Sequence, residues 1–374
     1  MILHIITGLG NGGAEGVLYR LCKFDKANEH VVISLMDYGK YGSLLEELGI
    51  KVHTLGMERG KFSIGAFWRL WRLIRYYKPE IVQTWMYHAD LIGGLISKLA
   101  MCKSIYWNVR HSTLQSGQSK KTTILILKTC AILSRFVPKG IIYCAESAKI
   151  VHERNGYKNN NSYVLNNGFS LEQLLIDANK REVFRSNLNL NDSTFLIGMV
   201  ARFDPQKDHF NLLKAFKLSK SLGASTKLAL VGHGLDASNI EITALIEEFG
   251  LTKDVFLLGQ QNDISSVMNG LDVHILSSAF GEGFPNVIAE AMACGTPCIA
   301  TNVGDSKEII GDLGWVVPPI DSARLSEAIG EAICEKLSGY DKWHRRRLDC
   351  RDKIVANFGI KKMIASYNLV WFKR

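Results

Sequence analysis

One stretch late in the chain, residues 277–295, constrains the fold more than any other. It reads SSAFGEGFPNVIAEAMACG and follows an apolar run from Val273 to Leu276 that predicts a buried strand. Pro285 suits a first helical turn, because its missing N–H is one that a helix start leaves without an intrahelical partner in any case. The stretch therefore predicts a strand, a loop and then a helix that begins at the mouth of a cleft.

The start of this helix is suited to bind an anion. The N–H groups of a first turn have no partner inside the helix, and the helix dipole places partial positive charge at the same end. The positions whose backbone we expect to contact the ligand are Gly283, Phe284, Asn286 and Val287.

Two carboxylates flank this anion seat, Glu282 before the helix and Glu290 about one turn into it. A phosphate would repel them, whereas an ionised carboxylate accepts hydrogen bonds from two neighbouring hydroxyl groups. The order of hydroxyls, phosphate and hydroxyls is that of a nucleotide sugar. Either Glu taken alone would be interpreted as a solvated residue on an ordinary amphipathic helix, and the Gly-Phe-Pro-Asn between them favours the site.

The run EGFPNVIAEAMACGTPCIATNVGD resembles the signature of the retaining glycosyltransferases of family 4. The resemblance extends over nearly the whole chain and implies the α/β GT-B fold, with two Rossmann-like domains facing across a cleft. It implies an acceptor-binding domain at residues 1–170, a nucleotide-sugar-binding domain at 171–357, and a final helix at 358–374 that packs back on the first domain. The polar segment that reaches about Arg185 is interpreted as the linker.

Length and composition agree with two globular domains. The chain has 374 residues, 47% of them hydrophobic, with only 7 Pro, which is enough for two cores of ordinary size. Apolar runs alternate with helical patterns, which predicts parallel sheets whose ligands lie beyond the carboxyl ends of the strands. We find no signal peptide and no apolar run near the roughly 20 residues of a membrane span. The eight cysteines are scattered along the chain. These features predict a cytoplasmic protein with reduced thiols.

A glycine-rich loop, residues 8–13, follows the first apolar run. Its sequence GLGNGG matches GxGxxG, and Asp37 closes the next expected strand, which is the pattern of a dinucleotide-binding fold. A nicotinamide-dependent oxidoreductase is therefore an alternative interpretation. The resemblance instead implies that Gly12 and Gly13 approach the phosphate and sugar of the donor, while Glu15 faces the acceptor.

Two histidines are expected where strand ends meet the cleft. His111 lies in the run WNVRHS, which resembles the family's pocket histidine beside the donor sugar, and His88 lies in QTWMYHAD, which resembles a segment near the acceptor. The other histidines singled out, His4, His209 and His274 among them, are interpreted as structural.

Two cations leave another expected strand, residues 195–200. Arg202 and Lys207 match the family's R-x4-K pattern and are predicted to converge on the diphosphate. The tight turn at Gly232 should bring the nucleoside close to backbone, and Gln260 lies where the family contacts the base.

The resemblance implies a reaction in which a nucleoside diphosphate leaves an anomeric carbon. Arg202 and Lys207 would stabilise the charge that grows on the leaving phosphate, Glu282 would hold the transferred sugar, Glu290 the ribose diol, and His111 would line the reacting side. The leaving phosphate itself would take the acceptor's proton. The chain contains no Asp-x-Asp, so no metal and no other cofactor is expected.

Charge is uneven along the chain. Residues 1–170 carry 22 Lys and Arg against 11 Asp and Glu, and the rest of the chain carries 23 against 25. Two helical segments, 67–78 and 120–139, mix cations with apolar residues, as membrane-surface helices do. The ordinary interpretation of the first is a packed helix whose aromatic side faces the sheet, whereas the resemblance favours membrane approach for the second.

The resemblance implies an enzyme that adds a sugar, with UDP as the favoured nucleotide, to a polyprenyl-diphosphate-linked or other lipid-linked glycan. The run KKTTILILKTCAILSRFVP and the Glu-containing stretch are most similar to bacterial O-antigen and capsule members of the family. We expect peripheral contact with the inner face of the cytoplasmic membrane and no nucleic-acid partner. A non-catalytic module that binds nucleotide sugars or anionic lipid is a further alternative.

Overall fold

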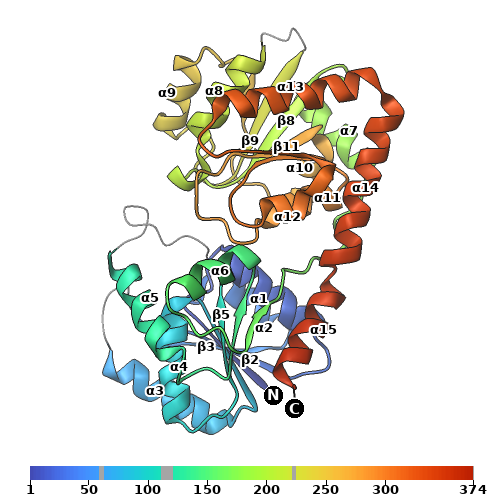
Figure 1. Ribbon diagram of the computed structural model, residues 1–374. Helices are drawn as coiled ribbons and strands as arrows, with labels where there is room; N and C mark the ends of the chain where they lie inside the picture. The colour runs from blue at the N-terminus through green and yellow to red at the C-terminus, as the bar shows by residue number, and fades with distance from the viewer. Residues whose placement is uncertain (59–62, 111–120, 221–224, 374) are drawn as a thin grey trace. The chain divides into compact units, whose positions relative to one another are not determined.

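A computed structural model describes residues 1–58, 63–110, 121–220 and 225–373. The chain divides into two compact units, one made of residues 1–169 with 360–374 and the other of residues 170–359 (Figure 1). We call them unit 1 and unit 2. Among the described residues, no helix combines the length and the apolar content that crossing a bilayer requires.

Unit 1 contains a seven-stranded sheet in the order β3-β2-β1-β4-β5-β6-β7, in which every pair is parallel. Its inner strands are buried on both faces, which is why they are continuous apolar runs without alternation. The strands are β1 (Ile2–Ile6), β2 (His30–Ser34), β3 (Lys51–Thr54), β4 (Ile81–Trp85), β5 (Ile105–Val109), β6 (Gly140–Tyr143) and β7 (Ser162–Val164).

The helices of unit 1 cover its sheet in two groups. One group includes α1, α2 and α15, with α15 packed against α1, and in the other α4 contacts both α3 and α5 (Figure 1). Tyr367 and Trp371 of α15 are buried in the core beside α1. The helices are α1 (Gly13–Phe24), α2 (Gly39–Glu46), α3 (Ile64–Tyr77), α4 (Tyr87–Leu99), α5 (Lys121–Leu133), α6 (Glu146–Arg154) and α15 (Ile360–Trp371).

Unit 2 contains a six-stranded parallel sheet in the order β10-β9-β8-β11-β12-β13. Both sheets share the doubly wound order 3-2-1-4-5-6, which places ligands beyond the carboxyl ends of the strands where the order reverses. In unit 2 that reversal lies between β8 and β11. The strands are β8 (Phe195–Val200), β9 (Thr226–Val231), β10 (Val255–Leu257), β11 (Val273–Leu276), β12 (Cys298–Thr301) and β13 (Trp315–Val317).

The segment expected to be a linker up to about Arg185 is partly a helix. Within it α7 begins at Ala178, packs against α10, and is capped by Asp177, whose side chain accepts from Lys180 N–H. Arg185 is buried. The longer helices of unit 2 are α7 (Ala178–Asn187), α8 (His209–Ser219), α9 (Ile240–Glu248), α10 (Ile264–Gly270), α11 (Asn286–Ala293), α12 (Ser306–Ile310), α13 (Ser322–Ser338) and α14 (Tyr340–Phe358).

The two tryptophans of α3 do not face the sheet, contrary to the ordinary interpretation of residues 67–78, whereas Tyr77 contacts His53 of β3. The buried residues of the helix are Ala66, Leu70 and Ile74. Trp68 is 56% exposed and Trp71 is 39% exposed. The aliphatic residues are buried, and the tryptophans are left on the outside.

Candidate functional site

In unit 2, β11 is followed by a loop of residues 277–285, which we call the donor loop, and then by α11. The helix begins at Asn286, directly after Pro285, as the sequence predicted. Its apolar face is buried, whereas Asn286, Val287 and Glu290 are partly exposed along the other side. The side chain of Phe284 is buried and meets Phe358 with 5.2 Å between ring centroids, so that only its backbone is suited to contact a ligand.

The start of α11 has no side-chain cap, a feature that it shares with α12 and α14. Pro285 offers no side-chain oxygen to the first-turn N–H groups. Most other long helices of unit 2 are capped by an aspartate side chain that accepts from a first-turn N–H, and these caps are Asp177, Asp208, Asp263 and Asp321. An anion at the start of α11 would therefore meet no capping carboxylate on the N-cap residue.

Lys207 and Glu282 form the central contact of this site. Lys207 Nζ lies 2.5 Å from Glu282 Oε1, and the same oxygen accepts from Ser278 Oγ at 2.6 Å. The side chains of Lys207 and Glu282 are 13% and 9% exposed. Two sequence-predicted residues that are 75 positions apart are thus brought together, and Ser278 is a partner that the sequence did not single out.

Backbone contacts hold the donor loop in place. Gly304 has a φ of +62°, and a Cβ there would lie 2.5 Å from the carbonyl oxygens of Glu282 and Gly283. Asp305 N donates to the Gly283 carbonyl at 2.9 Å, and Ala279 N donates to Gln206 O at 2.9 Å. Only glycine fits at position 304, because a larger residue would push the Glu282 segment away.

Arg202 and Lys207 leave β8 in the same short segment but have different partners. Arg202 Nε donates to Asp204 Oδ2 at 3.0 Å, and the Arg202 side chain is 58% exposed. Burial raises the pKa of Asp204, but hydrogen bonds from Gln206 N–H and Arg202 outweigh it and lower that pKa overall. For both cations to bind one diphosphate as predicted, the Arg202 guanidinium must break its hydrogen bond to Asp204 or contact Asp204 and the diphosphate at the same time.

The turn at Gly232 packs against the segment that carries Arg202. Gly232 has a φ of +148°, and a Cβ there would lie 1.8 Å from Ala201 O, while Phe203 N donates to His233 O at 2.8 Å. Gly232 N in turn donates to Gly259 O at 2.8 Å, which brings exposed Gln260 to the same end of the sheet. These contacts place the predicted nucleoside positions beside the predicted phosphate positions.

Two histidines near Lys207 are buried and uncharged. Burial and the positive charge of Lys207 lower the pKa of His209 to about 4 and that of His274 to about 3. His274 Nε2 accepts from Val200 N–H at 3.3 Å. Neither side chain is exposed, in agreement with their interpretation as structural residues.

In unit 1 the glycine loop, residues 8–13, is lined by carboxylates. Leu9 N donates to Asp37 Oδ1 at 3.1 Å. Glu15 folds back on Gly12, so that a Cβ on Gly12 would lie 2.3 Å from Glu15 Oε2. Burial and the neighbouring Asp37 raise the pKa of Glu15, although a backbone hydrogen bond opposes them. Asp37 thus supports the loop, whereas a dinucleotide site would need that carboxylate for the ribose.

Of the two histidines expected where strand ends meet the cleft, the structure describes one. His88 lies in the first turn of α4, three residues after the carboxyl end of β4, with its side chain exposed. Met86 before it has a φ of +71°, a conformation that costs a non-glycine residue energy and is often found at functional sites. No pattern in the sequence predicted this conformation of Met86. His111 lies outside the described residues.

Among the described residues, one group has the composition of a metal site, namely His4, Cys22 and His30, whose ligand atoms lie within 4.8 Å of one another. Trp85 Nε1 donates to His4 Nδ1 at 3.2 Å, His4 and His30 share a hydrogen bond of 3.0 Å, and His30 lies 3.3 Å from Asp25. With neutral imidazole rings, the Trp85 indole N–H donates to His4, and His4 donates to His30. His30 then directs its remaining N–H at the Asp25 carboxylate. A metal on His4 Nε2 would leave the proton on Nδ1, where it would face the indole N–H, so these residues fit a structural hydrogen-bond network better than a metal site.

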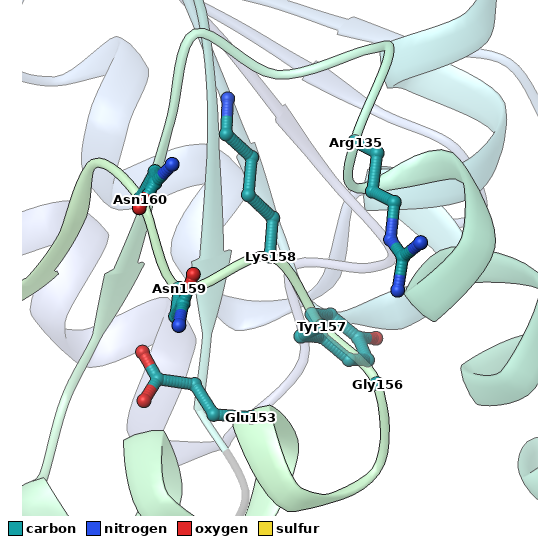
Figure 2. A pocket seen from close by; sticks show the side chains of 7 residues that line it. All are labelled: Arg135, Glu153, Gly156, Tyr157, Lys158, Asn159 and Asn160. Atoms are coloured by element: carbon teal, nitrogen blue, oxygen red, sulfur yellow. The ribbon is translucent and has the colours of Figure 1, made fainter.

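A surface cavity of about 420 Å³ lies elsewhere in unit 1 (Figure 2). Arg135, Lys158 and Glu153 line it, with the loop that precedes β7. It therefore lies at the amino edge of the sheet, away from the carboxyl ends where sites of this fold form, and it includes no sequence-predicted site residue.

Two protein-family models match the chain. The model described as Glycosyltransferase Family 4 matches residues 11–173, and the model described as Glycosyl transferases group 1 matches residues 180–347. The matches meet close to the boundary between units 1 and 2.

Named relatives agree with these models. The UDP-Gal:alpha-D-GlcNAc-diphosphoundecaprenol alpha-1,3-galactosyltransferase of Escherichia coli is 25% identical over 300 residues, which are 79% of this chain and 76% of the relative. The capsular polysaccharide biosynthesis glycosyltransferase CapM of Staphylococcus aureus is 28% identical over 328 residues, 84% of each chain. Anabaena HepE, solved in complex with UDP, matches with a TM-score of 0.86 and 20% identity over 100% of both chains.

Fold, site and relatives together define the class of protein, which is a glycosyltransferase with the GT-B fold. Within that class the chain belongs to the family 4 glycosyltransferases, as the stretch around Glu282 and Glu290 indicated. This membership decides against the oxidoreductase and the non-catalytic binding module as the function of the chain.

Proposed function

We propose that this enzyme transfers a sugar from a UDP-sugar to a lipid-linked glycan during assembly of a bacterial surface polysaccharide, such as an O-antigen or a capsule. The reaction retains the configuration at the anomeric carbon and needs no metal ion. The observation that carries the proposal is the buried pair of Lys207 and Glu282 beside the start of α11.

The relatives support the choice of donor and acceptor class. The name of the Escherichia coli relative specifies a UDP-sugar donor and a diphosphoundecaprenol-linked acceptor, CapM is named for capsule biosynthesis, and HepE was solved with UDP. Both named relatives match about four fifths of this chain.

The donor diphosphate would lie between the two cations and the first turn of α11. Lys207 is already held beside the donor loop, and Arg202 extends from the same segment with an exposed guanidinium. Glu290, one turn into α11, would accept hydrogen bonds from the ribose hydroxyls, and Glu282 would accept from the transferred sugar. Gln260 and the turn at Gly232 would contact the nucleoside.

Bond breaking moves negative charge onto the leaving phosphate. Fixed positive groups next to that phosphate bind the transition state more tightly than the ground state, which lowers the barrier. The ion pair with Glu282 holds the Lys207 ammonium group in position when no donor is bound, so this cation is in place before the reaction begins. The acceptor hydroxyl would attack on the face that the phosphate leaves, and a phosphate oxygen would take its proton.

Metal independence is tested by measuring transfer in excess EDTA. The cations and the helix start supply the positive charge that a divalent ion held by Asp-x-Asp would otherwise provide, so we expect activity to persist. A strict requirement for Mn²⁺ or Mg²⁺ would contradict this part of the proposal.

Donor class is tested by thermal unfolding with UDP-sugars and GDP-sugars. A ligand at 100 times its Kd stabilises the folded state by about 2.7 kcal/mol, because only the folded state binds it. We expect UDP-sugars to raise Tm and GDP-sugars to raise it less. A larger shift with GDP-sugars would reassign the nucleotide, and no shift with either would remove the proposed donor site.

The basic half of the chain is proposed to approach the inner face of the cytoplasmic membrane. A lipid-linked acceptor stays in the bilayer, so the enzyme must meet it at the surface. The excess of cations in residues 1–170 is suited to an anionic leaflet.

A further inference from the structure

The outer side of α3 carries one continuous row of large residues. Ile64, Trp68, Trp71 and Arg75 follow one another at spacings of four, three and four positions, which places them along a single line on a helix. We call this row the α3 stripe. Ile64 is 76% exposed, and all four residues face away from the buried Ala66, Leu70 and Ile74.

Only cations accompany these apolar residues. Arg69, Arg72 and Lys78 are exposed beside the stripe, and positions 63–79 contain no acidic residue. The Arg72 guanidinium lies 4.6 Å from the centroid of Trp68, and that of Arg75 lies 6.0 Å from that of Trp71. The solvent side of a helix is normally polar, whereas this one alternates indole rings with guanidinium groups.

The exposure of these tryptophans is particular to α3. The chain has seven Trp. Trp85, Trp107, Trp343 and Trp371 are buried and Trp315 is half-buried, so the two in the α3 stripe are the exposed ones. Isolated exposed apolar residues need no explanation, but several in one row indicate an interaction surface.

We propose that the α3 stripe is an interfacial anchor that lies in the headgroup region of an anionic lipid bilayer. Trp is favoured at that depth because one end of the ring is apolar and the other can donate a hydrogen bond. Arginine stems lie along apolar surface while their charged ends reach the phosphates. The inference rests on the proposed function, since an enzyme with a lipid-linked acceptor works at the bilayer.

The charge of the stripe distinguishes a bilayer from a second copy of this chain. A symmetric contact through α3 would bring the three arginines of one copy against those of the other, and residues 63–79 supply no carboxylate to separate them. An anionic surface meets the same charges favourably, at about 1 kcal/mol for each cation near it. Charge complementarity therefore favours the lipid surface.

Another helix of unit 1 also exposes large apolar residues. α4 lies between α3 and α5 (Figure 1). Leu125 and Ile132 of α5 and Phe136 just after it are 67%, 66% and 68% exposed. α5, which belongs to the segment expected to approach a membrane, thus lies in the same helical layer as α3.

The test measures binding to vesicles without donor or acceptor. Vesicles of phosphatidylcholine alone are compared with vesicles that also contain phosphatidylglycerol, by co-sedimentation of the whole chain. We expect binding to the anionic vesicles only. Arg72→Ser with Arg75→Ser should weaken it about thirtyfold, and Trp68→Ser with Trp71→Ser should weaken it about tenfold or more.

Matched controls separate this surface from general stickiness. Ile240→Ser with Tyr340→Ser removes two residues of unit 2 that are 82% and 80% exposed, and it should leave vesicle binding unchanged. Trp68→Phe with Trp71→Phe keeps the apolar rings, so binding should persist while the quenching of tryptophan fluorescence by brominated lipids is lost.

Several outcomes would overturn the proposal. They are equal binding of the Trp68→Ser, Trp71→Ser variant and the wild type, equal binding to both kinds of vesicle, and an α3-dependent dimer that ignores vesicles. UDP-induced thermal stabilisation of every variant confirms folding. It also tests the donor site separately, so failure of the anchor and failure of the proposed function are distinguishable.

Discussion

At the scale of single residues, Lys207 and Glu282 show what a motif predicts and what it leaves out. Both residues were found from their spacing within family patterns, and the structure places them in contact. Their partner Ser278 and the Asp204 carboxylate that holds Arg202 were not predicted. Hydrogen bonds of this kind depend on side-chain directions in loops, which no periodic pattern records.

The two glutamates are expected to differ in their kinetic effect. Glu290→Ala should weaken UDP binding, because the ribose hydroxyls lose their acceptor. Glu282→Ala should mainly lower kcat, because it removes the acceptor for the hydroxyls of the transferred sugar and the partner that holds Lys207 in place. Calorimetric titration with UDP and steady-state kinetics check both, and unchanged UDP affinity in Glu290→Ala would break the ribose assignment.

Removing one partner of the buried pair should also affect stability. Lys207→Met leaves the Glu282 carboxylate buried without its cation, and such changes cost about 3–5 kcal/mol. Lys207→Met combined with Glu282→Leu removes both charges and should recover most of that loss. Chemical denaturation of the three proteins gives the free energies of unfolding, and an equal loss in the single and double variants would show that the pair is not coupled.

At the scale of elements, the alternation of parallel strands and helices followed from the sequence, but α7 did not. Its residues are largely polar, and its position depends on Asp272, which lies 87 residues beyond Arg185 in the chain. Arg181 and Lys336 each donate to Asp272 Oδ1 at 2.8 Å, and Leu196 N donates to Oδ2 at 2.8 Å. A helix fixed by one buried carboxylate has little hydrophobic periodicity, which is why it resembled a linker.

Asp272→Asn should therefore destabilise unit 2. The change leaves Arg181, Arg185 and Lys336 without their shared anion, and we expect a loss of about 3–5 kcal/mol. Asp263→Asn is the matched control, because its side chain is 57% exposed to solvent, pairs with Lys180, and remains a good helix cap as Asn. That control should cost less than about 1 kcal/mol, and similar losses in both variants would contradict a special role for Asp272.

At the scale of the whole molecule, buried neutral histidines set the response to acid. Burial lowers the pKa of His4 well below its ordinary value, lowers that of His209 to about 4 and lowers that of His274 to about 3. The unfolded chain takes up these protons near about pH 6.5, whereas the folded chain takes them up only at lower pH. The contribution of these histidines to the free energy of unfolding is therefore complete above about pH 6.5 and decreases as the pH falls.

The expected slope is about 1.4 kcal/mol per pH unit for each such histidine between pH 6 and pH 4.5. His209→Gln and His274→Gln should each reduce the slope by that amount in denaturation curves recorded across this range. Buried Asp272, whose pKa is lowered by its cations against the effect of burial, loses its contribution only below its ordinary pKa of about 3.9. A slope that is unchanged in both variants would contradict the assignment.

A crystal structure of the enzyme with UDP would show directly whether the donor diphosphate lies between Arg202, Lys207 and the start of α11. We expect diphosphate oxygens within hydrogen-bond distance of both cations and of first-turn N–H groups, with the ribose diol on Glu290. UDP bound at another place, such as the glycine loop of residues 8–13 alone, would contradict it.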